Sequence, residues 1–145
     1  MQGRGPARLE RDSLEEALAG LCSALSAETG VDARFHCEEE VGGLPPEVRA
    51  ALLRIAQGAL ANVREHSGAD RVVVTLARIG DRVVLDVIDD GAGFDPGAPS
   101  PGPGRGRGLA SSRARAEELG GELTVESAPG EGTGVSASFP VGEDG

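Results

Sequence analysis

The sequence predicts an α+β fold, a two-layer sandwich in which a mixed, mostly antiparallel sheet packs on three helices. Three stretches show the 3.6-residue apolar period of helices, and five short stretches alternate as half-buried strands do. The 145 residues include three phenylalanines and neither tryptophan nor tyrosine, so the core must be aliphatic. This length fits one domain, which we place at 12–141, between a linker at 1–11 and a tail at 142–145.

The N-terminal part predicts helix, strand and helix. Residues 12–30 begin with an Asp or Ser cap and end at a glycine, as helices do. Residues 31–38 alternate and predict a strand. After a Gly-Gly and Pro-Pro break, Pro46 opens a second helix that reaches about His66. The apolar positions are Leu14, Leu18, Leu21 and Leu25 in the first helix, and Leu52, Ile55, Ala56, Ala59, Leu60 and Val63 in the second.

The middle of the chain predicts a hairpin, a loop and a third helix. Residues 71–79 and 81–89 are two strands with Gly80 between them. Segment 95–107 has four prolines, four glycines and no large apolar residue, so we expect it to be mobile. A helix over 109–119 follows, closed by a glycine pair.

The C-terminal part predicts a second hairpin. Residues 122–127 and 133–139 alternate, and the turn APGEG joins them. Because alternate side chains share a face, one set should point into the core. That set is Leu123, Val125, Val135, Ala137 and Phe139.

Charge and composition exclude several classes of function. The formal net charge of -10 repels nucleic acid and anionic membranes, so we expect no nucleic-acid partner. Cys22 and Cys37 are too few for a zinc site or a disulfide framework, which favours two reduced core residues in a cytoplasmic domain. No apolar run approaches the ~20 residues of a membrane span, although attachment of a longer parent protein to a membrane stays open.

One margin of the second helix carries an unusual set of residues. Gly58, Asn62 and His66 follow one another at four-residue intervals, beside the apolar stripe. A glycine inside a helix costs about 1 kcal/mol relative to alanine, and no turn is signalled at Gly58. A single helical asparagine usually satisfies itself against the backbone, so this margin alone does not indicate a site.

Asp89 ends a row of inward-facing apolar side chains. It shares the face of Val83, Leu85 and Val87, and a buried carboxylate needs hydrogen-bond donors or changes its pKa. One interpretation is a capping aspartate in the turn DDGAG. The other is a carboxylate held in a pocket to accept from a ligand N–H group, with Gly91 and Gly93 allowing close approach of the backbone.

Two glycine-rich stretches complete the set of candidates. Gly106 and Gly108, in GRGL, precede the third helix, whose N-terminal N–H groups could meet a phosphate. A Walker A loop is excluded because the chain contains no lysine. Thr133, in GEGTG, could be a ligand contact or only part of a hairpin turn.

In this order the four signals resemble the GHKL-type ATP-binding (Bergerat) fold. The stretch GRGLASSRARAEELGGELTVESAPGEGTGVSASFPV is especially similar to the catalytic domain of bacterial sensor histidine kinases that act on helix-turn-helix response regulators. The likeness covers about Leu44 to Val141. It implies ATP and Mg2+ as ligands, a histidine-containing dimerisation domain and a response regulator as partners, and a monomeric isolated domain.

The resemblance implies a role for each candidate residue. Asn62 would hold the magnesium ion, and Asp89 would accept from the adenine amino group. Segment 95–107 would be the ATP lid. The remaining implied contacts are Gly91, Gly93 and Thr133 at the purine, and His66, Gly106, Arg107, Gly108 and Leu109 toward the phosphates. Arg107 stands where this subgroup commonly has histidine, and its side chain still offers a hydrogen-bond donor.

Gly58 is the clearest departure from the family pattern. The resemblance expects a glutamate there, four residues before Asn62, as the general base that helps to activate the acceptor imidazole or a water. Glycine cannot take a proton, and Gln57 is neutral and about 100° round the helix. The change could be introduced or natural. Loss of a general base typically lowers the rate by 10²–10⁴-fold, whereas nucleotide binding should survive.

The resulting expectation is an ATP-binding catalytic domain that transfers the γ-phosphoryl group to a histidine elsewhere. Neither His36 nor His66 lies in a suitable acceptor helix, so this chain should bind ATP without phosphorylating itself. Two alternatives stay open. One is a serine kinase resembling anti-sigma factors with the same fold, and the other is a catalytically degenerate nucleotide-binding module.

Overall fold

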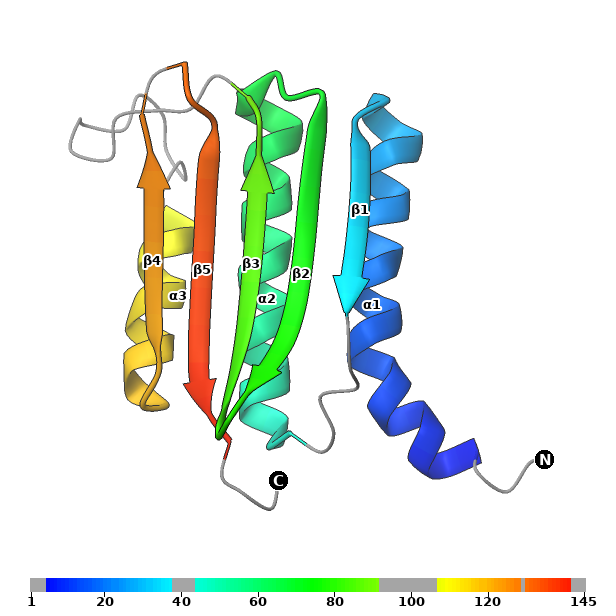
Figure 1. The fold of residues 1–145 in the computed structure, drawn as a ribbon, viewed down its shortest axis with the longest axis vertical. Coiled ribbons are helices and arrows are strands. Elements are labelled where there is room, and N and C mark those ends of the chain that lie inside the picture. Colours follow the sequence, from blue (N-terminus) through cyan, green and yellow to red (C-terminus); the bar gives the residue numbers. More distant parts are fainter. Residues whose placement is uncertain (1–4, 38–43, 92–106, 129, 142–145) are drawn as a thin grey trace.

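Three helices cover one face of a five-stranded sheet in the computed structural model of the chain (Figure 1). The structure describes residues 5–37, 44–91, 107–128 and 130–141. The predicted α+β class and its two layers are therefore confirmed. Among the described residues, no helix has both the length and the apolar character needed to cross a membrane.

The helices begin and end close to the predicted residues, with three differences. Helix α1 spans Gly5–Thr29, so it starts before the predicted Asp12. Helix α2 spans Pro46–Asn62, and its continuation η1, Val63–Ser67, is a π-helical turn rather than α-helix. Helix α3 spans Arg107–Glu118, so the last residue of the expected lid already belongs to the helix.

The sheet is mixed and mostly antiparallel, as predicted. Its strands are β1 (Asp32–Cys37), β2 (Arg71–Ile79), β3 (Arg82–Asp89), β4 (Glu122–Ser127) and β5 (Thr133–Pro140), in the order β1-β2-β3-β5-β4. Strands β1 and β2 pair in parallel, because α2 returns the chain across the sheet between them. All other pairs are antiparallel.

The aliphatic core lies between the sheet and the helices. Helix α2 packs on β3 and β5, α1 on β1, and α3 on β4. The predicted apolar stripe of α2 and the inward residues of β4 and β5 are confirmed as buried or packed against the core. In α1, Leu14, Leu18 and Leu25 are buried, Leu21 is partly buried and packs against the core, and Cys22 is buried, as expected of a core residue. Cys22 follows Leu18 by four residues and precedes Leu25 by three, so it continues the inward face of α1.

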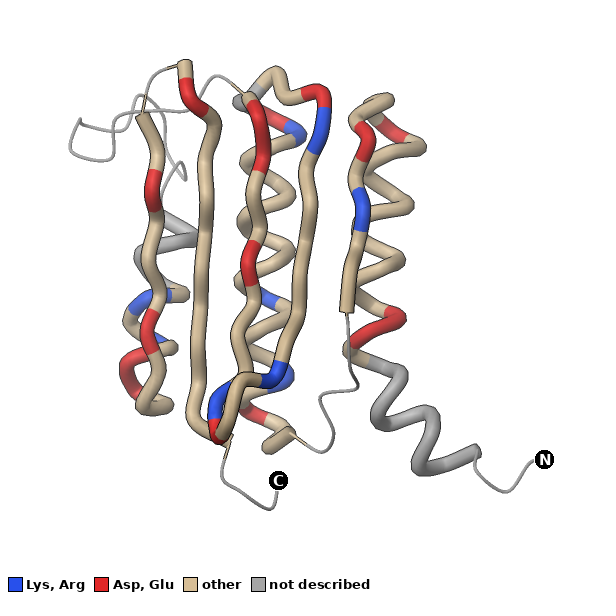
Figure 2. The backbone as a smooth tube through the Cα atoms, viewed as in Figure 1, with Lys and Arg blue, Asp and Glu red and all other residues tan. Residues whose placement is uncertain are grey.

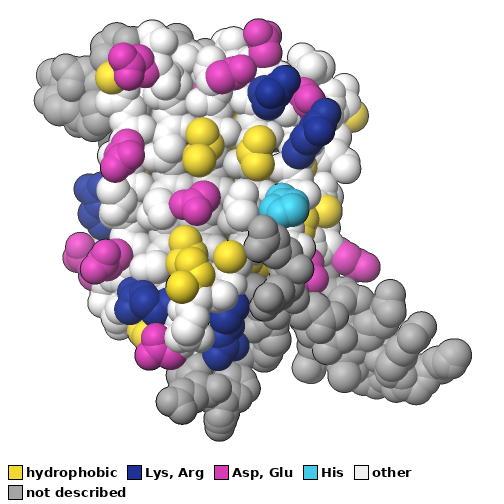
Figure 3. Space-filling model, viewed as in Figure 1, with side chains coloured by type: hydrophobic (Ala, Val, Ile, Leu, Met, Phe, Trp, Pro, Cys, Tyr) yellow, Lys and Arg dark blue, Asp and Glu magenta, His cyan; other side chains and the backbone are white. Residues whose placement is uncertain are grey.

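None of the described helices lies on the outer face of the sheet. Figure 3 shows small, separated hydrophobic patches among charged side chains on this face. The most exposed large apolar residues are Ile79 and Ile88. Acidic residues and arginines are interspersed over both layers (Figure 2), so the net charge is not confined to one element.

One end of the sandwich collects the elements that carry the candidate residues. Strands β3 and β4 end there, β5 begins there, and α2 ends behind β3 at the same end (Figure 1). Asn62 and Asp89 are 27 positions apart, and both lie at this end of the sandwich. They do so because α2 and β3 run in the same direction and β2 runs back between them.

Candidate functional site

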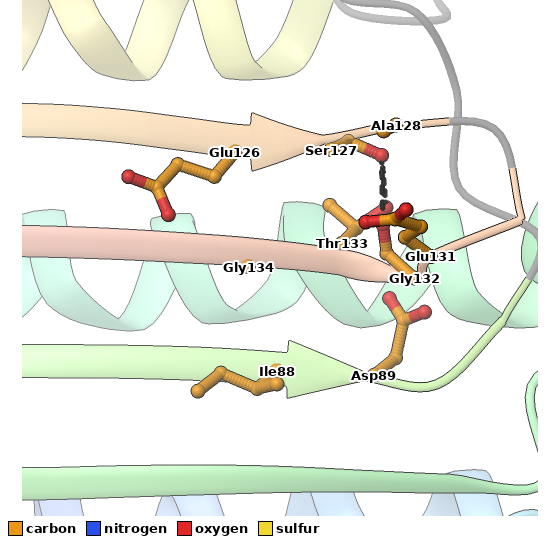
Figure 4. Close-up of a pocket in the computed structure, with 9 residues that line it drawn as sticks. All are labelled: Ile88, Asp89, Glu126, Ser127, Ala128, Glu131, Gly132, Thr133 and Gly134. Atoms are coloured by element: carbon orange, nitrogen blue, oxygen red, sulfur yellow. Dashed lines mark hydrogen bonds between the residues drawn. The ribbon is translucent and has the colours of Figure 1, made fainter.

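A cavity of about 450 Å3 opens at this end of the sheet (Figure 4). It is lined by the ends of β3 and β4 and by the turn that leads into β5. The lining residues are Ile88, Asp89, Glu126, Ser127, Ala128, Glu131, Gly132, Thr133 and Gly134. Of the residues singled out from the sequence, Asp89 and Thr133 therefore lie together, as direct partners in the β3–β5 register.

Asp89 is the buried carboxyl group that the strand pattern predicted. Its exposed fraction is 8%, and it continues the inward row of Val83, Leu85 and Val87. Its Oδ1 atom accepts a hydrogen bond of 2.8 Å from the Gly91 amide. Burial raises the pKa of this carboxyl above its ordinary value, and the nearby Asp90 carboxylate adds to the effect. The amide hydrogen bonds from Gly91 and Thr133 act in the opposite direction.

Both interpretations of Asp89 describe part of its environment. The Gly91 contact is the expected turn-capping bond of an aspartate beside glycine. The same carboxyl group also lines the cavity, and Figure 4 shows it pointing toward the turn that contains Gly132. One oxygen atom is thus held by the backbone while the group as a whole faces the cavity.

Gly132 allows the turn before β5 to approach β3. Its φ angle is +78°, a conformation that favours glycine, and a Cβ atom there would collide with the Asp89 carbonyl oxygen. This close approach holds the Thr133 amide beside the Asp89 carboxyl group. Gly132 lies in the GEGTG stretch but was not among the predicted site residues.

Ser127 is a further residue that the sequence analysis missed. Its hydroxyl group lies 2.9 Å from the Gly132 carbonyl oxygen and 2.9 Å from Thr133 Oγ1. Strand register brings it there, because Ser127 is the direct partner of Thr133 across β4 and β5. An available signal was its position at the end of an alternating strand, in step with Val125 and Leu123. We call Asp89, Gly91, Ser127, Gly132 and Thr133 the purine end, because the resemblance implies contacts to a purine at Asp89, Gly91 and Thr133.

Asp90 is bound differently from its neighbour Asp89. Its Oδ1 atom accepts hydrogen bonds of 2.9 and 3.0 Å from the amides of Asp70 and Arg71. These bonds lower the pKa of the Asp90 carboxyl group. Asp90 therefore ties the end of β3 to the segment between η1 and β2, where the chain leaves the Asn62 helix.

Gly58 and Asn62 lie at the predicted margin of α2. Both are half-buried, between the buried positions Ala59 and Val63 and the exposed Gln57. A Cβ atom added at Gly58 would meet no atom of the described residues within 4 Å, so their packing does not require glycine there. We call Gly58 and Asn62 the phosphate end, because the resemblance implies magnesium and the phosphates beside Asn62. Asn62 is not among the residues that line the cavity at the purine end.

The other candidates are placed only in part. His66 lies in η1 and Arg107, Gly108 and Leu109 lie in the first turn of α3, but their side chains fall outside the described part of the structure. Gly93, Gly106 and residues 95–106 of the expected lid also lie outside the described residues. The contacts expected of these residues stay predictions.

Comparison with known proteins places the chain and its relatives in one family. Residues 47–143 match the model of the histidine kinase-, DNA gyrase B- and HSP90-like ATPases. The sensor histidine kinase LiaS of Bacillus subtilis is 32% identical over 136 residues, and MctS of Rhizobium johnstonii is 34% identical over 135. These alignments cover 94% and 93% of this chain but 36% and 29% of the relatives, so the chain spans about a third of their length.

Solved structures agree with this family. The histidine kinase domain of a blue-light activated kinase from Erythrobacter litoralis superposes with a TM-score of 0.68 at 25% identity, covering 88% of this chain and 61% of that one. The catalytic domain of histidine kinase ThkA has the same TM-score at 17% identity, covering 90% and 92%, and supports the fold alone. The chain therefore belongs to the family of histidine kinase-, DNA gyrase B- and HSP90-like ATPases.

Proposed function

We propose that this chain is the ATP-binding catalytic domain of a sensor histidine kinase. It binds Mg-ATP and presents the γ-phosphoryl group to a histidine on a separate dimerisation domain, which then supplies a response regulator. The observation that carries the proposal is the buried, cavity-facing carboxyl group of Asp89 at the end of β3. In a chain of this family, similar over nearly its whole length to sensor histidine kinases, such a group suits an adenine amino donor.

At the purine end, Asp89 accepts a hydrogen bond from the amino group of the base. Gly91 and the turn at Gly132 hold the carboxyl group in place through their backbone. The raised pKa means that burial disfavours the charged form in the absence of a ligand, and an amino donor compensates for that cost. Thr133 lies beside this carboxyl group in the same cavity.

At the phosphate end, the amide oxygen of Asn62 would hold Mg2+. Nucleotide-bound Mg2+ usually takes one or two protein oxygen ligands and shares the phosphates. A half-buried amide oxygen fits this role, and the described residues contain no cluster of three or more His, Cys, Asp or Glu side chains that would bind a metal by itself. When bound, the ion neutralises charge on the phosphates. The helix N-terminus of α3, with Gly106, Arg107 and Gly108, would contact the phosphates.

Transfer requires a base that this chain lacks at the expected place. As the histidine nitrogen attacks, the bond between the γ-phosphorus and the bridging oxygen breaks, and the imidazole proton must leave. Gly58 has no group that accepts it. This observation favours a second candidate function, a nucleotide-binding module with little or no transfer activity. A serine kinase resembling anti-sigma factors has no comparable observation in its favour.

The proposed setting is the cytoplasm, where ATP is available and thiols stay reduced. Cys22 and Cys37, both described, form no disulfide. We propose that the isolated domain is monomeric, because dimerisation belongs to the separate histidine-containing domain.

Calorimetric titration with Mg-ATP tests the proposal through a matched pair of variants. Asp89→Asn should weaken binding by more than about tenfold, because a hydrogen bond to a charged group is lost. Asp86→Asn is the control: it removes a carboxylate from the same strand, but on the outer face. Equal affinity of the wild type and Asp89→Asn would contradict the proposed adenine contact.

A further inference from the structure

Three polar side chains form one row across the purine end. Asp89 of β3, Thr133 of β5 and Ser127 of β4 are successive partners in the strand register. Figure 4 shows Ser127 and Thr133 beside each other, with Asp89 on the neighbouring strand. All three residues line the cavity. Whether this row donates or accepts hydrogen bonds toward a ligand depends on the direction in which the Ser127 and Thr133 hydroxyl hydrogen atoms point.

The Ser127 hydroxyl group has a single hydrogen atom, and both the Gly132 carbonyl oxygen and Thr133 Oγ1 lie close to it. The Gly132 carbonyl oxygen, 2.9 Å away, can only accept, so the hydrogen atom of this contact comes from Ser127. Thr133 Oγ1, also 2.9 Å away, can either donate or accept. One proton arrangement satisfies both contacts: Ser127 donates to Gly132, and Thr133 donates to Ser127.

The backbone donors around Asp89 are engaged in the same way. The Gly91 amide donates to Asp89 Oδ1, and the Thr133 amide also donates to the Asp89 carboxyl group. Thr133 therefore directs both of its hydrogen atoms, amide and hydroxyl, at protein acceptors. Its remaining lone pairs and those of Asp89 are what the row presents to the cavity.

We propose that Ser127 is a positioning residue that turns Thr133 into an acceptor and thereby favours bases that donate a hydrogen bond from their 6-position. The inference rests on the proposed function, in which a purine nucleotide occupies the cavity. A 6-aminopurine can donate the hydrogen atoms of its 6-amino group to these acceptors. A 6-oxopurine places a carbonyl oxygen against acceptors, and burying an acceptor without a donor is unfavourable.

Removing the Ser127 hydroxyl group changes this selectivity. In Ser127→Ala, Thr133 loses its acceptor, and its hydrogen atom can rotate toward the ligand. A carbonyl oxygen at the 6-position then finds a donor. Binding of 6-oxopurine nucleotides should improve relative to ATP, although no atom of Ser127 needs to touch the base.

The test compares the dissociation constants of ATP and inosine triphosphate, which differ in the 6-amino and 6-oxo groups. We expect the ratio of Kd for inosine triphosphate to Kd for ATP to fall about tenfold in Ser127→Ala, the effect of one hydrogen bond. Ser127→Thr keeps a hydroxyl group on a β-branched side chain suited to a strand, and should preserve the wild-type ratio. Ser136→Ala, on the outer face of β5, is the matched control.

The outcomes separate this inference from the proposed function. An unchanged ratio in folded Ser127→Ala, with normal ATP binding by the wild type, overturns the role of Ser127 alone. Failure of the wild type to bind either nucleotide overturns both proposals. If Ser127→Ala does not fold, Thr133→Val tests the same point, because removal of the opposing acceptor should also lower the ratio. An unchanged ratio there overturns the inference as well.

Discussion

The purine end and the phosphate end of the expected nucleotide site are built in opposite ways. At the purine end, Asp89, Ser127 and Thr133 contact one another or the backbone, and Gly132 is required by its φ angle and by its close approach to β3. At the phosphate end, Gly58 has open space where a Cβ atom would be. The first region has geometry that most substitutions would disturb, whereas the second would accept a side chain without rearrangement. Nucleotide recognition and phosphoryl transfer should therefore be separable in this chain.

The largest expected effect comes from supplying a base at Gly58. We predict that Gly58→Glu raises phosphoryl transfer to an added acceptor domain by about 10²–10⁴-fold, the usual contribution of general-base catalysis. The affinity for ATP should stay similar, since the purine end is unchanged. Transfer of a labelled γ-phosphoryl group measures the rate.

Gly58→Gln is the matched control for that experiment. It has nearly the same size and helix propensity as glutamate but cannot take a proton. If Gln increased transfer as much as Glu, the effect would come from helix stability rather than from base catalysis, and the comparison between the two ends would fail.

A substitution in the turn before β5 should disrupt the purine end. We predict that Gly132→Ala lowers the free energy of unfolding by more than the ~1–2 kcal/mol that a left-handed conformation costs an ordinary residue, because the new Cβ atom also collides with Asp89. ATP affinity should fall as well. Urea unfolding and calorimetry measure the two effects.

Gly130→Ala separates the two causes. Gly130 has a similar φ angle of +83°, but a Cβ atom there meets nothing within 4 Å. It should cost only the conformational part and leave ATP affinity near that of the wild type. Equal losses in both alanine variants would contradict the close approach of Gly132 to β3.

The two neighbouring carboxyl groups should respond to pH with opposite signs. The pKa of Asp89 is higher in the folded chain than in the unfolded chain. The contribution of Asp89 to the free energy of unfolding therefore decreases as the pH rises from the unfolded-state pKa to the folded-state pKa. The pKa of Asp90 is lower in the folded chain than in the unfolded chain. Its contribution to the free energy of unfolding is therefore present above the unfolded-state pKa and is lost as the pH falls through the folded-state pKa. Because ATP needs the charged form of Asp89, affinity should fall about tenfold per pH unit below the raised pKa.

Nucleotide titrations over a series of pH values measure this dependence. Asp90→Asn keeps an acceptor oxygen for the Asp70 and Arg71 amides, so the pH dependence of ATP affinity should persist. Its midpoint should move to lower pH, because the Asp90 charge no longer raises the pKa of Asp89. If the pH dependence of ATP affinity disappeared in Asp90→Asn but persisted in Asp89→Asn, the titrating group would be Asp90, and our assignment to Asp89 would be wrong.

The smallest expected effect is a gain in stability at the phosphate end. Gly58→Ala should raise the free energy of unfolding by about 0.5–1 kcal/mol, since alanine has the higher helix propensity and its methyl group enters open space. Thermal unfolding measures it. A loss of stability would show that packing, contrary to the contacts around Gly58, requires a glycine in α2.

Much of the fold and part of the site followed from local patterns. The five strands, the apolar stripe of α2 and the inward position of Asp89 could be predicted because side-chain periods of 3.6 and 2 residues depend only on backbone geometry. The early start of α1 and the π-helical turn of η1 were not predicted, because propensity at helix ends is weak and packing decides them.

The sequence by itself determined which residues face inward and that Gly58 stands where the family pattern expects a glutamate. Only the tertiary structure decided that Gly132 and Thr133 meet Asp89, that Ser127 meets Gly132 and Thr133, and that Gly58 has space around it. The approach of Gly132 and Thr133 to Asp89 depends on the register between β3 and β5, which are adjacent in the sheet but distant in the chain, whereas Ser127 and Thr133 flank the turn of one hairpin. The hairpin register follows from its short turn, but the pairing of β3 with β5 is set by packing of the inward faces of strands that the sequence does not place side by side.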